Sequence, residues 1–199
     1  MKGTGRLTDD LAAYLRDRII SGEIAGGTAL AEANLAHEYD VARPTARAAI
    51  EILARDGLVQ RKPNVPAVVS TITSEELPEI LALLETSEMI ALDLILENDP
   101  DLRPLRRELA HSTYSLLDQL VQASGSERLA SLHRRLTYEL ILARVNQPIQ
   151  IVDDGGERHE LVASLLQQDA DAARAALTSI QGMRKESLGA IKAAHEHPR

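Results

Sequence analysis

One stretch decides the fold: residues 39–59, which read YDVARPTARAAIEILARDGLV. Proline's fixed φ and missing N–H are harmless in the first turn of a helix, so Arg43-Pro44 predicts a helix start. Apolar residues then recur at helical spacing and form one buried stripe: Ala46, Ala49, Ile50 and Leu53. Gly57 ends the pattern. The stretch therefore predicts a turn followed by a helix over residues 43–56.

The flanking segments complete a small domain. Before the stretch, Leu7, Leu11, Leu15 and Ile19 recur every four residues and predict a helix that ends at Gly22. A short helix near residues 31–39 presents Leu35 and Ala36 inward, and Asp40 suits the following turn because Asp tolerates the left-handed conformation. After Gly57, residues 58–61 and 67–71 are β-branched enough to be strands, joined by residues 62–66. Three helices and a β-hairpin, or wing, predict a winged helix-turn-helix domain over residues 1–72.

The pattern becomes helical throughout residues 73–199. Ser74-Glu75-Glu76-Leu77 is typical of a capped helix start, and the helix runs toward Glu97. Three more helices are predicted over residues 102–123, 127–146 and 157–194. The fold class is therefore mainly α: an N-terminal winged helix-turn-helix plus a C-terminal antiparallel α-helical bundle.

Charge is distributed unevenly along the chain, whose net charge is −8. Residues 1–70 carry nine of the 22 Lys and Arg and nine of the 30 Asp and Glu, so the remainder holds 13 basic and 21 acidic residues. A neutral first domain can approach a polyanion while the acidic second domain is repelled from it. The alternative is that the net charge of −8 is simply that of an ordinary acidic protein.

Composition excludes several classes. There is no cysteine, which rules out disulfides and thiolate zinc sites and fits a reducing compartment. The most apolar stretch, Met89–Leu96, is too short to span a bilayer, so we expect a cytoplasmic protein without a membrane partner. Aromatic residues make up 2%, too few for stacking on single strands. No phosphate-binding glycine loop, HExxH or Gly-x-Ser-x-Gly occurs, so an enzyme is not expected.

Five residues are candidates for contact with double-stranded DNA. Arg43 and Arg47 lie four residues apart beside the buried stripe, so both can enter a major groove, where arginine binds guanine bidentately. Thr45 is placed to bind a phosphate near the helix start, and Arg61 and Lys62 lie at the wing. A helix face that contacts only water is the alternative for these arginines.

Residues 39–59, together with Gly27–Ala36, resemble the GntR family of bacterial regulators. The resemblance implies a sequence-specific transcriptional regulator, expected to be a repressor, that binds a DNA operator as a homodimer. Three features depart from the family pattern. Ala42 stands where serine is common, which removes an N-cap worth about 1 kcal/mol. Ala33 stands near a common arginine, and Asn64-Val65-Pro66 replaces the usual glycine turn of the wing.

The C-terminal half resembles the FCD domain of the FadR subfamily at residues 79–85, 132–136 and 158–174. That domain often binds a divalent metal through one aspartate and three histidines, and the metal helps hold a small carboxylate effector. His133 and His159 match two histidine positions, Ile180 or Gln181 the third, and Leu129 stands at the aspartate position. The set is incomplete, so a metal or effector site at His133, His159 and Gln181 competes with a hydrogen-bonded core histidine at His133. Only 12 residues separate Asn146 from His159, fewer than the subfamily usually has. The short connection is either a real deletion, which would leave about four helices, or a stretch missing from the chain.

Three hypotheses about function follow from the sequence. The first is a dimeric, effector-responsive DNA-binding regulator. The second is a dimeric regulator of the same build that has no effector. The third is a winged-helix module that binds other proteins.

Overall fold

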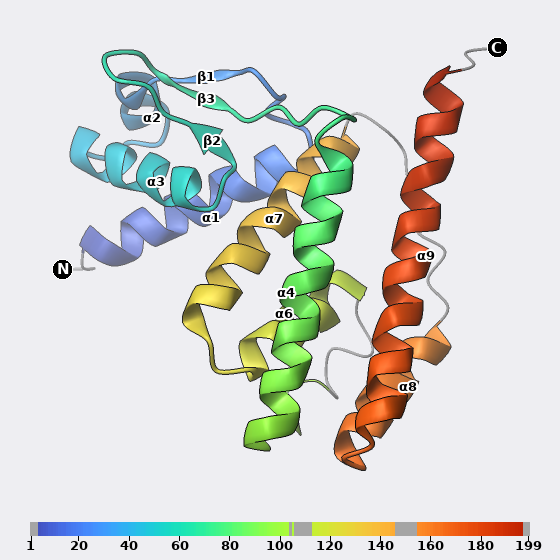
Figure 1. Cartoon of the computed structure of the whole chain (residues 1–199). Helices are drawn as coiled ribbons and strands as arrows, with labels where there is room; N and C mark the ends of the chain where they lie inside the picture. Colours follow the sequence, from blue (N-terminus) through green and yellow to red (C-terminus); the bar gives the residue numbers. More distant parts are fainter. Residues whose placement is uncertain (1–3, 104, 106–112, 146–154, 197–199) are drawn as a thin grey trace. The chain divides into compact units, whose positions relative to one another are not determined.

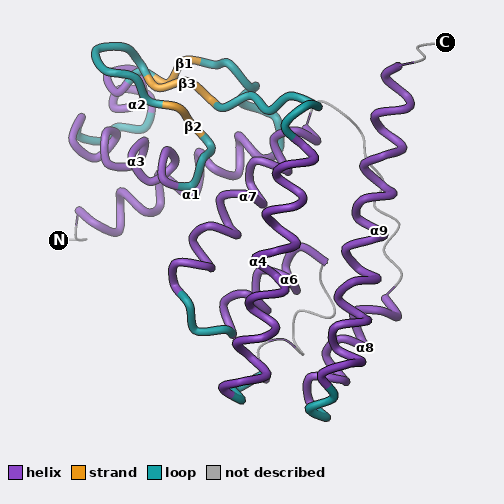
Figure 2. Tube along the Cα trace, in the orientation of Figure 1, coloured by secondary structure: helices purple, strands orange, loops and turns teal. Residues whose placement is uncertain are grey.

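The computed structural model describes residues 4–103, 105, 113–145 and 155–196, and the chain forms two compact units. Unit 1 comprises Met1–Leu77 with Tyr138–Asn146, and unit 2 comprises Pro78–Thr137 with Gln147–Arg199. Helices dominate both units, and a small sheet belongs to the first, so the predicted fold class is confirmed (Figure 2). No helix among the described residues is long and apolar enough to cross a membrane.

Unit 1 has the predicted three helices and wing (Figure 1). The helices are α1 (Thr4–Ile20), α2 (Glu32–Glu38) and α3 (Arg43–Arg55), and the wing strands are β2 (Val59–Gln60) and β3 (Ala67–Val69). Asp40 has a φ of 49°, the left-handed turn that the sequence predicts. The wing hairpin is also as predicted, with Val59 opposite Val69 and Gln60 opposite Val68.

The sequence does not reveal strand β1 (Ala29–Leu30), which pairs antiparallel with β3 and gives the sheet order β1-β3-β2. Two residues are too few to show an alternating pattern. Leu7, the first of the four apolar residues whose spacing predicts α1, is 44% exposed. The buried face of α1 instead follows Thr8, Leu11, Ala12, Leu15 and Ile19.

Unit 1 has one continuous core. Leu15, Ile50, Leu53 and Leu58 are each at most 1% exposed, and Leu142 from the C-terminal part of α7 (Glu127–Val145) joins the same cluster. Arg16 of α1 contacts the C-cap residue of α3 and a tyrosine of α7. Its Nη2 donates to Asp56 Oδ2 at 2.6 Å, and its guanidinium lies 5.8 Å from the Tyr138 ring centroid. These contacts hold the inner face of α3 against the core of unit 1.

Unit 2 contains α4 (Leu77–Asn98), α6 (Thr113–Ala123), most of α7, α8 (Gly155–Leu166) and α9 (Ala170–Glu196). A turn over residues 74–76 precedes α4, and the Thr73 N–H and hydroxyl both donate to Glu76 Oε2 at 2.8 Å. Polar contacts pair Glu85 with Lys185 and Asp93 with Arg174, so α4 and α9 run antiparallel.

The prediction of one long last helix over residues 157–194 is wrong. Gln168 has a φ of 57°, which ends α8, and the Asp169 side chain accepts a hydrogen bond from the Ala172 N–H at 3.0 Å, which caps α9. Unit 2 therefore has five helices within the described residues rather than about four. The predicted helix over residues 102–123 is described only in part, since residues 104 and 106–112 lie outside the described residues, as do residues 146–154 in the short connection.

Candidate nucleic-acid interface

Helix α3 carries Arg43 and Arg47 on its exposed side. Its opposite face is fixed in the core by four residues that are at most 1% exposed: Ala46, Ala49, Ile50 and Leu53. Both arginines are exposed, and 61% of the Arg47 side chain is accessible. Ala42 is the N-cap residue, with extended backbone and no side-chain hydrogen bond, as its departure from the family pattern implies. The geometry leaves both guanidinium groups available to an external ligand.

Thr45 does not belong to this surface. It is only 2% exposed, because it lies on the inner side of the first turn of α3 beside buried Ala46. The predicted contact of its hydroxyl with phosphate is therefore withdrawn.

The wing supplies the other two predicted residues. Arg61 and Lys62 are exposed and directly follow β2. Asn64 adopts a φ of 62° in the wing turn. Asn adopts the left-handed conformation more readily than most residues with a side chain, so Asn64 can take the place of the missing glycine. The departure at residues 64–66 therefore leaves the wing turn intact.

A hollow of about 580 Å³ separates the wing from α3. Its lining comes from the start of α2, from Arg47 and Ile50 of α3, and from residues 61–67 of the wing. Three of the lining side chains are basic: Arg47, Arg61 and Lys62. The structure therefore brings both predicted basic elements to one concave surface, while Arg43 lies at the start of α3 outside the lining.

Two carboxylates within this basic surface were missed from the sequence. Glu32, at the start of α2, places Oε1 at 3.3 Å from Arg47 Nε and at 3.5 Å from Arg61 Nη2. Glu51 accepts a hydrogen bond from Arg61 Nη1 at 3.0 Å. Neither acid follows a local pattern that marks it, because each meets its partner only when helices and wing pack together.

His133 and Gln181, two of the three residues predicted as a metal or effector site, meet inside unit 2. The side chains of both residues contact the carboxylate of Glu88 of α4, which is fully buried. Arg184 Nη1 and Nη2 donate to the two carboxylate oxygens of Glu88 at 2.7 and 2.9 Å. Gln181 Nε2 donates to Glu88 Oε2 at 2.9 Å, and His133 Nε2 lies 3.3 Å from Oε1. We call Glu88, His133, Gln181 and Arg184 the hub.

The hub does not fit a divalent metal. A guanidinium already pairs with both oxygens of the single central carboxylate, and a second cation at the same oxygens would be repelled. His159, the third predicted residue, is exposed, whereas all four hub residues are buried. Among the described residues, no three His, Asp or Glu are grouped as metal ligands. The hydrogen-bonded core histidine is the alternative that the geometry of His133 supports, since it is 1% exposed.

The pKa values of Glu88 and His133 depend on the charged groups around them. Burial alone would raise the pKa of Glu88, but His133 and Arg184 together hold that pKa below its usual value. For His133, burial lowers the pKa, but the neighbouring carboxylates of Asp118 and Glu88 raise it above the usual 6.5 overall. The Nδ1 atom of His133 lies 3.9 Å from Asp118 Oδ1. The imidazole therefore lies between two carboxylates, from α4 and α6.

These shifts predict how stability depends on pH. A raised histidine pKa adds stability that is fully present below the unfolded value of about 6.5 and is lost as pH rises through the folded value. The lowered pKa of Glu88 adds stability that is present above the ordinary carboxyl value and is lost as pH falls below it, so it does not change between pH 6 and alkaline pH. We expect the free energy of unfolding, measured by urea titration, to fall from pH 6 to mildly alkaline pH, and His133→Asn to flatten this dependence. His159→Asn is the control. An unchanged slope in the His133 variant would contradict the assignment.

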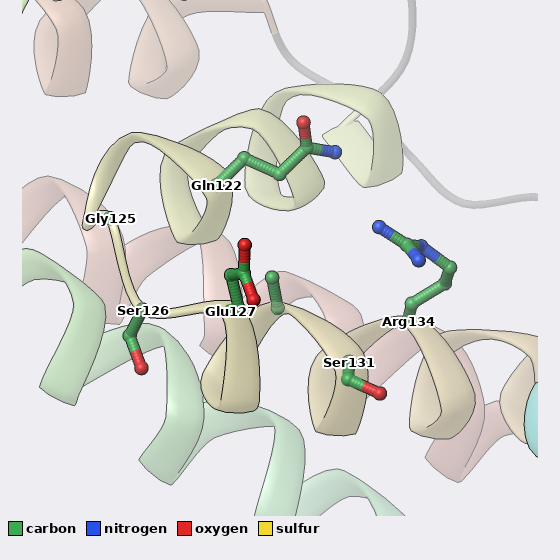
Figure 3. A pocket seen from close by; sticks show the side chains of 7 residues that line it. Gln122, Gly125, Ser126, Glu127, Ser131 and Arg134 are labelled. Atoms are coloured by element: carbon green, nitrogen blue, oxygen red, sulfur yellow. The ribbon is translucent and has the colours of Figure 1, made fainter.

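A second hollow, of about 460 Å³, lies where α6 meets α7 (Figure 3). Gln122 of α6 and Glu127, Ser131 and Arg134 of α7 are among the residues that line it. Its two charged side chains, Glu127 and Arg134, are both exposed and of opposite sign. None of the residues predicted to form a site lines it.

Two residues of the hub could have been found from the sequence. Glu88 falls on the buried stripe of α4 between Leu84 and Leu92, and Arg184 continues the buried stripe of α9 after Leu177 and Ile180. A charged residue in register with buried leucines indicates a buried ion pair, because an unpaired buried charge is costly. The spacing does not reveal which acid meets which base.

Comparison with known proteins agrees with this architecture. Residues 7–69 match the family model described as bacterial regulatory proteins, gntR family. The gluconate operon transcriptional repressor of Bacillus licheniformis is 44% identical over 70 residues, 35% of this chain and 28% of that protein. The repressor of the same name from Bacillus subtilis is 33% identical over 100 residues, 50% of this chain and 40% of that protein. The matched region thus spans less than half the length of these relatives.

Solved structures extend the similarity of fold along the chain. A candidate GntR-type regulator from Rhodococcus sp. RHA1 superposes with a TM-score of 0.67 at 24% identity, covering 92% of this chain and 98% of that chain. E. coli McbR/YncC superposes with a TM-score of 0.68 at 18% identity, covering 94% and 98%. At these identities the likeness concerns the fold alone. Residues 7–69 of the chain are therefore similar to the gntR family of bacterial regulatory proteins.

Proposed function

We propose that this protein is a dimeric transcriptional regulator that binds a palindromic, double-stranded DNA operator through unit 1 and represses transcription. The observation that carries the proposal is the exposed pair Arg43 and Arg47 on α3, next to the basic wing. A recognition helix of this kind places the residues of its first turns against base edges in the major groove. The names of the two Bacillus relatives support repression as the direction of control.

A homodimer would use unit 2. On α4, Leu83 and Ile90 are 43% and 46% exposed and lie two turns apart on one face. A second copy of the chain that covered Leu83 and Ile90 would remove their apolar surface from water. The resulting two-fold dimer would place two winged helices on a palindromic operator. We expect two chains for each operator duplex, acting in the cytoplasm.

The experiment is selection of duplexes from a random pool by the full chain, followed by titration of a selected duplex at several salt concentrations. A palindromic consensus and an affinity that falls steeply with salt are expected, because Lys and Arg release counterions when they neutralise phosphates. Selection of no sequence, with no salt-dependent binding, would contradict the proposal and favour a winged-helix module that binds proteins.

The hub supports a regulator that takes neither a metal nor an organic acid at this place. Arg184, the cation that would attract a carboxylate effector, already pairs with both oxygens of Glu88. The same titrations, repeated with a panel of small mono- and dicarboxylic acids and with zinc or manganese, are therefore expected to be unchanged. A shift in operator affinity that Arg184→Met abolishes would instead favour the effector-responsive form.

A further inference from the structure

Glu32 is an acidic residue inside the basic hollow of unit 1. Its Oε1 atom lies 3.3 Å from Nε of Arg47 on α3 and 3.5 Å from Nη2 of Arg61 on the wing. One carboxylate oxygen therefore faces two cations that come from different elements. The Glu32 side chain is 34% exposed, so it remains accessible from the hollow.

Such ion pairs contribute little to the stability of a fold. Pairs between partly exposed side chains typically add less than about 1 kcal/mol because water and salt screen them. Their effect on a polyanion is larger, since a fixed negative charge at the binding surface repels every phosphate that approaches. The bridge of Glu32 is therefore better explained by binding than by folding.

We propose that Glu32 is a positioning residue that sets specificity: it occupies Arg47 and Arg61 until a cognate site replaces it. The inference rests on the proposed DNA-binding function. At a random sequence, phosphates alone must draw the guanidinium groups away from Glu32 against its charge. At the operator, base-edge hydrogen bonds to Arg47 offset that cost.

The neighbouring acid reinforces this arrangement. Glu51, one turn beyond Arg47 on α3, accepts a hydrogen bond from Arg61 at 3.0 Å. Arg61 is thus held from two sides, with 35% of its side chain exposed. Arg47 has 61% exposed and, within the described part of the chain, forms an ion pair with Glu32 alone. Arg47 is therefore the more easily released of the two, which suits a residue that reads bases.

The test is Glu32→Gln in the full chain, which keeps the shape of the side chain and removes its charge. Two probes are used: a duplex that the parent protein selects from a random pool, and a scrambled duplex of the same length and composition. The matched control is Glu38→Gln, which removes one charge from the same helix but pairs with Arg18 and does not line the hollow. Affinity is measured for both probes over a series of salt concentrations.

We expect Glu32→Gln to bind the scrambled duplex about fivefold more tightly and to steepen its salt dependence by about one released counterion. The affinity for the selected duplex should change less, so the ratio between the two probes should fall. Glu38→Gln should leave the ratio unchanged, and thermal unfolding should match the parent for both variants.

Two results would overturn the inference and leave the proposed function standing: equal shifts in the two variants, or a loss of affinity for both duplexes in Glu32→Gln. The second would mean that Glu32 acts only as structural support for the surface. If the parent protein binds neither duplex in a salt-dependent way, the proposed function and this inference both fail.

Discussion

Arg47→Ala is expected to weaken binding to a selected operator by about tenfold to a hundredfold while the fold is unchanged. A bidentate contact to a base contributes about 1–3 kcal/mol of discrimination, and Arg47 is the exposed arginine of α3 that faces the hollow. Its side chain is 61% accessible, so truncation leaves no buried group unsatisfied. The measurement is a fluorescence-anisotropy titration with the selected duplex, alongside thermal unfolding.

The control for this prediction is Arg55→Ala. Arg55 is an exposed arginine in the last turn of the same helix, and it does not line the hollow. Arg55→Ala removes the same charge as Arg47→Ala, so comparing the two variants separates a specific contact of Arg47 from a general loss of electrostatic attraction. If the two variants bind the operator equally well, α3 does not read DNA through Arg47.

Arg184→Met is expected to produce the largest loss of stability, about 3–5 kcal/mol of unfolding free energy. It leaves the carboxylate of Glu88 buried without its cation, and breaking a buried pair from one side is costly for that reason. Glu88 is 0% and Arg184 3% exposed. Urea titration followed by circular dichroism measures the loss.

Two further variants make this prediction specific. Arg174→Met breaks an exposed pair on the same helix, 2.8 Å from Asp93, and is expected to cost less than about 1 kcal/mol. The double variant Glu88→Leu with Arg184→Met removes both charges, so it should recover much of the stability that the single variant loses. A double variant no more stable than Arg184→Met alone would show that the hub stabilises unit 2 by some route other than charge pairing.

The architecture of unit 1 could be predicted because its signals are local. Arg43-Pro44 starts a helix, Gly57 stops one, and the four-residue spacing of apolar residues from Leu11 to Ile19 marks the buried face of α1. Each signal acts through the conformation of a few neighbouring residues. Where the signal was weak the prediction failed: two residues were too few to mark β1, and no glycine or proline announced the turn at Gln168 that separates α8 from α9.

The candidate sites could be predicted less well than the fold of unit 1, because packing brings their residues together. The position of Arg47 on α3 follows from helical spacing, but the burial of Thr45 depends on which elements cover the first turn of α3. The pairing of Glu32 with Arg61 joins residues 29 positions apart, and that of Glu88 with Arg184 joins residues 96 positions apart. No local pattern encodes these distances.

The sequence by itself determined the turn, the recognition helix, the wing and the helical character of the second half, because backbone conformation responds to nearby residues. Only the tertiary structure decided which charges neutralise one another. It placed Glu32 between two arginines that face the hollow, and it buried Glu88 against Arg184. The physical reason is that the energy of a charge depends on its distance from other charges and on the exclusion of water, and both are set by the packing of distant segments.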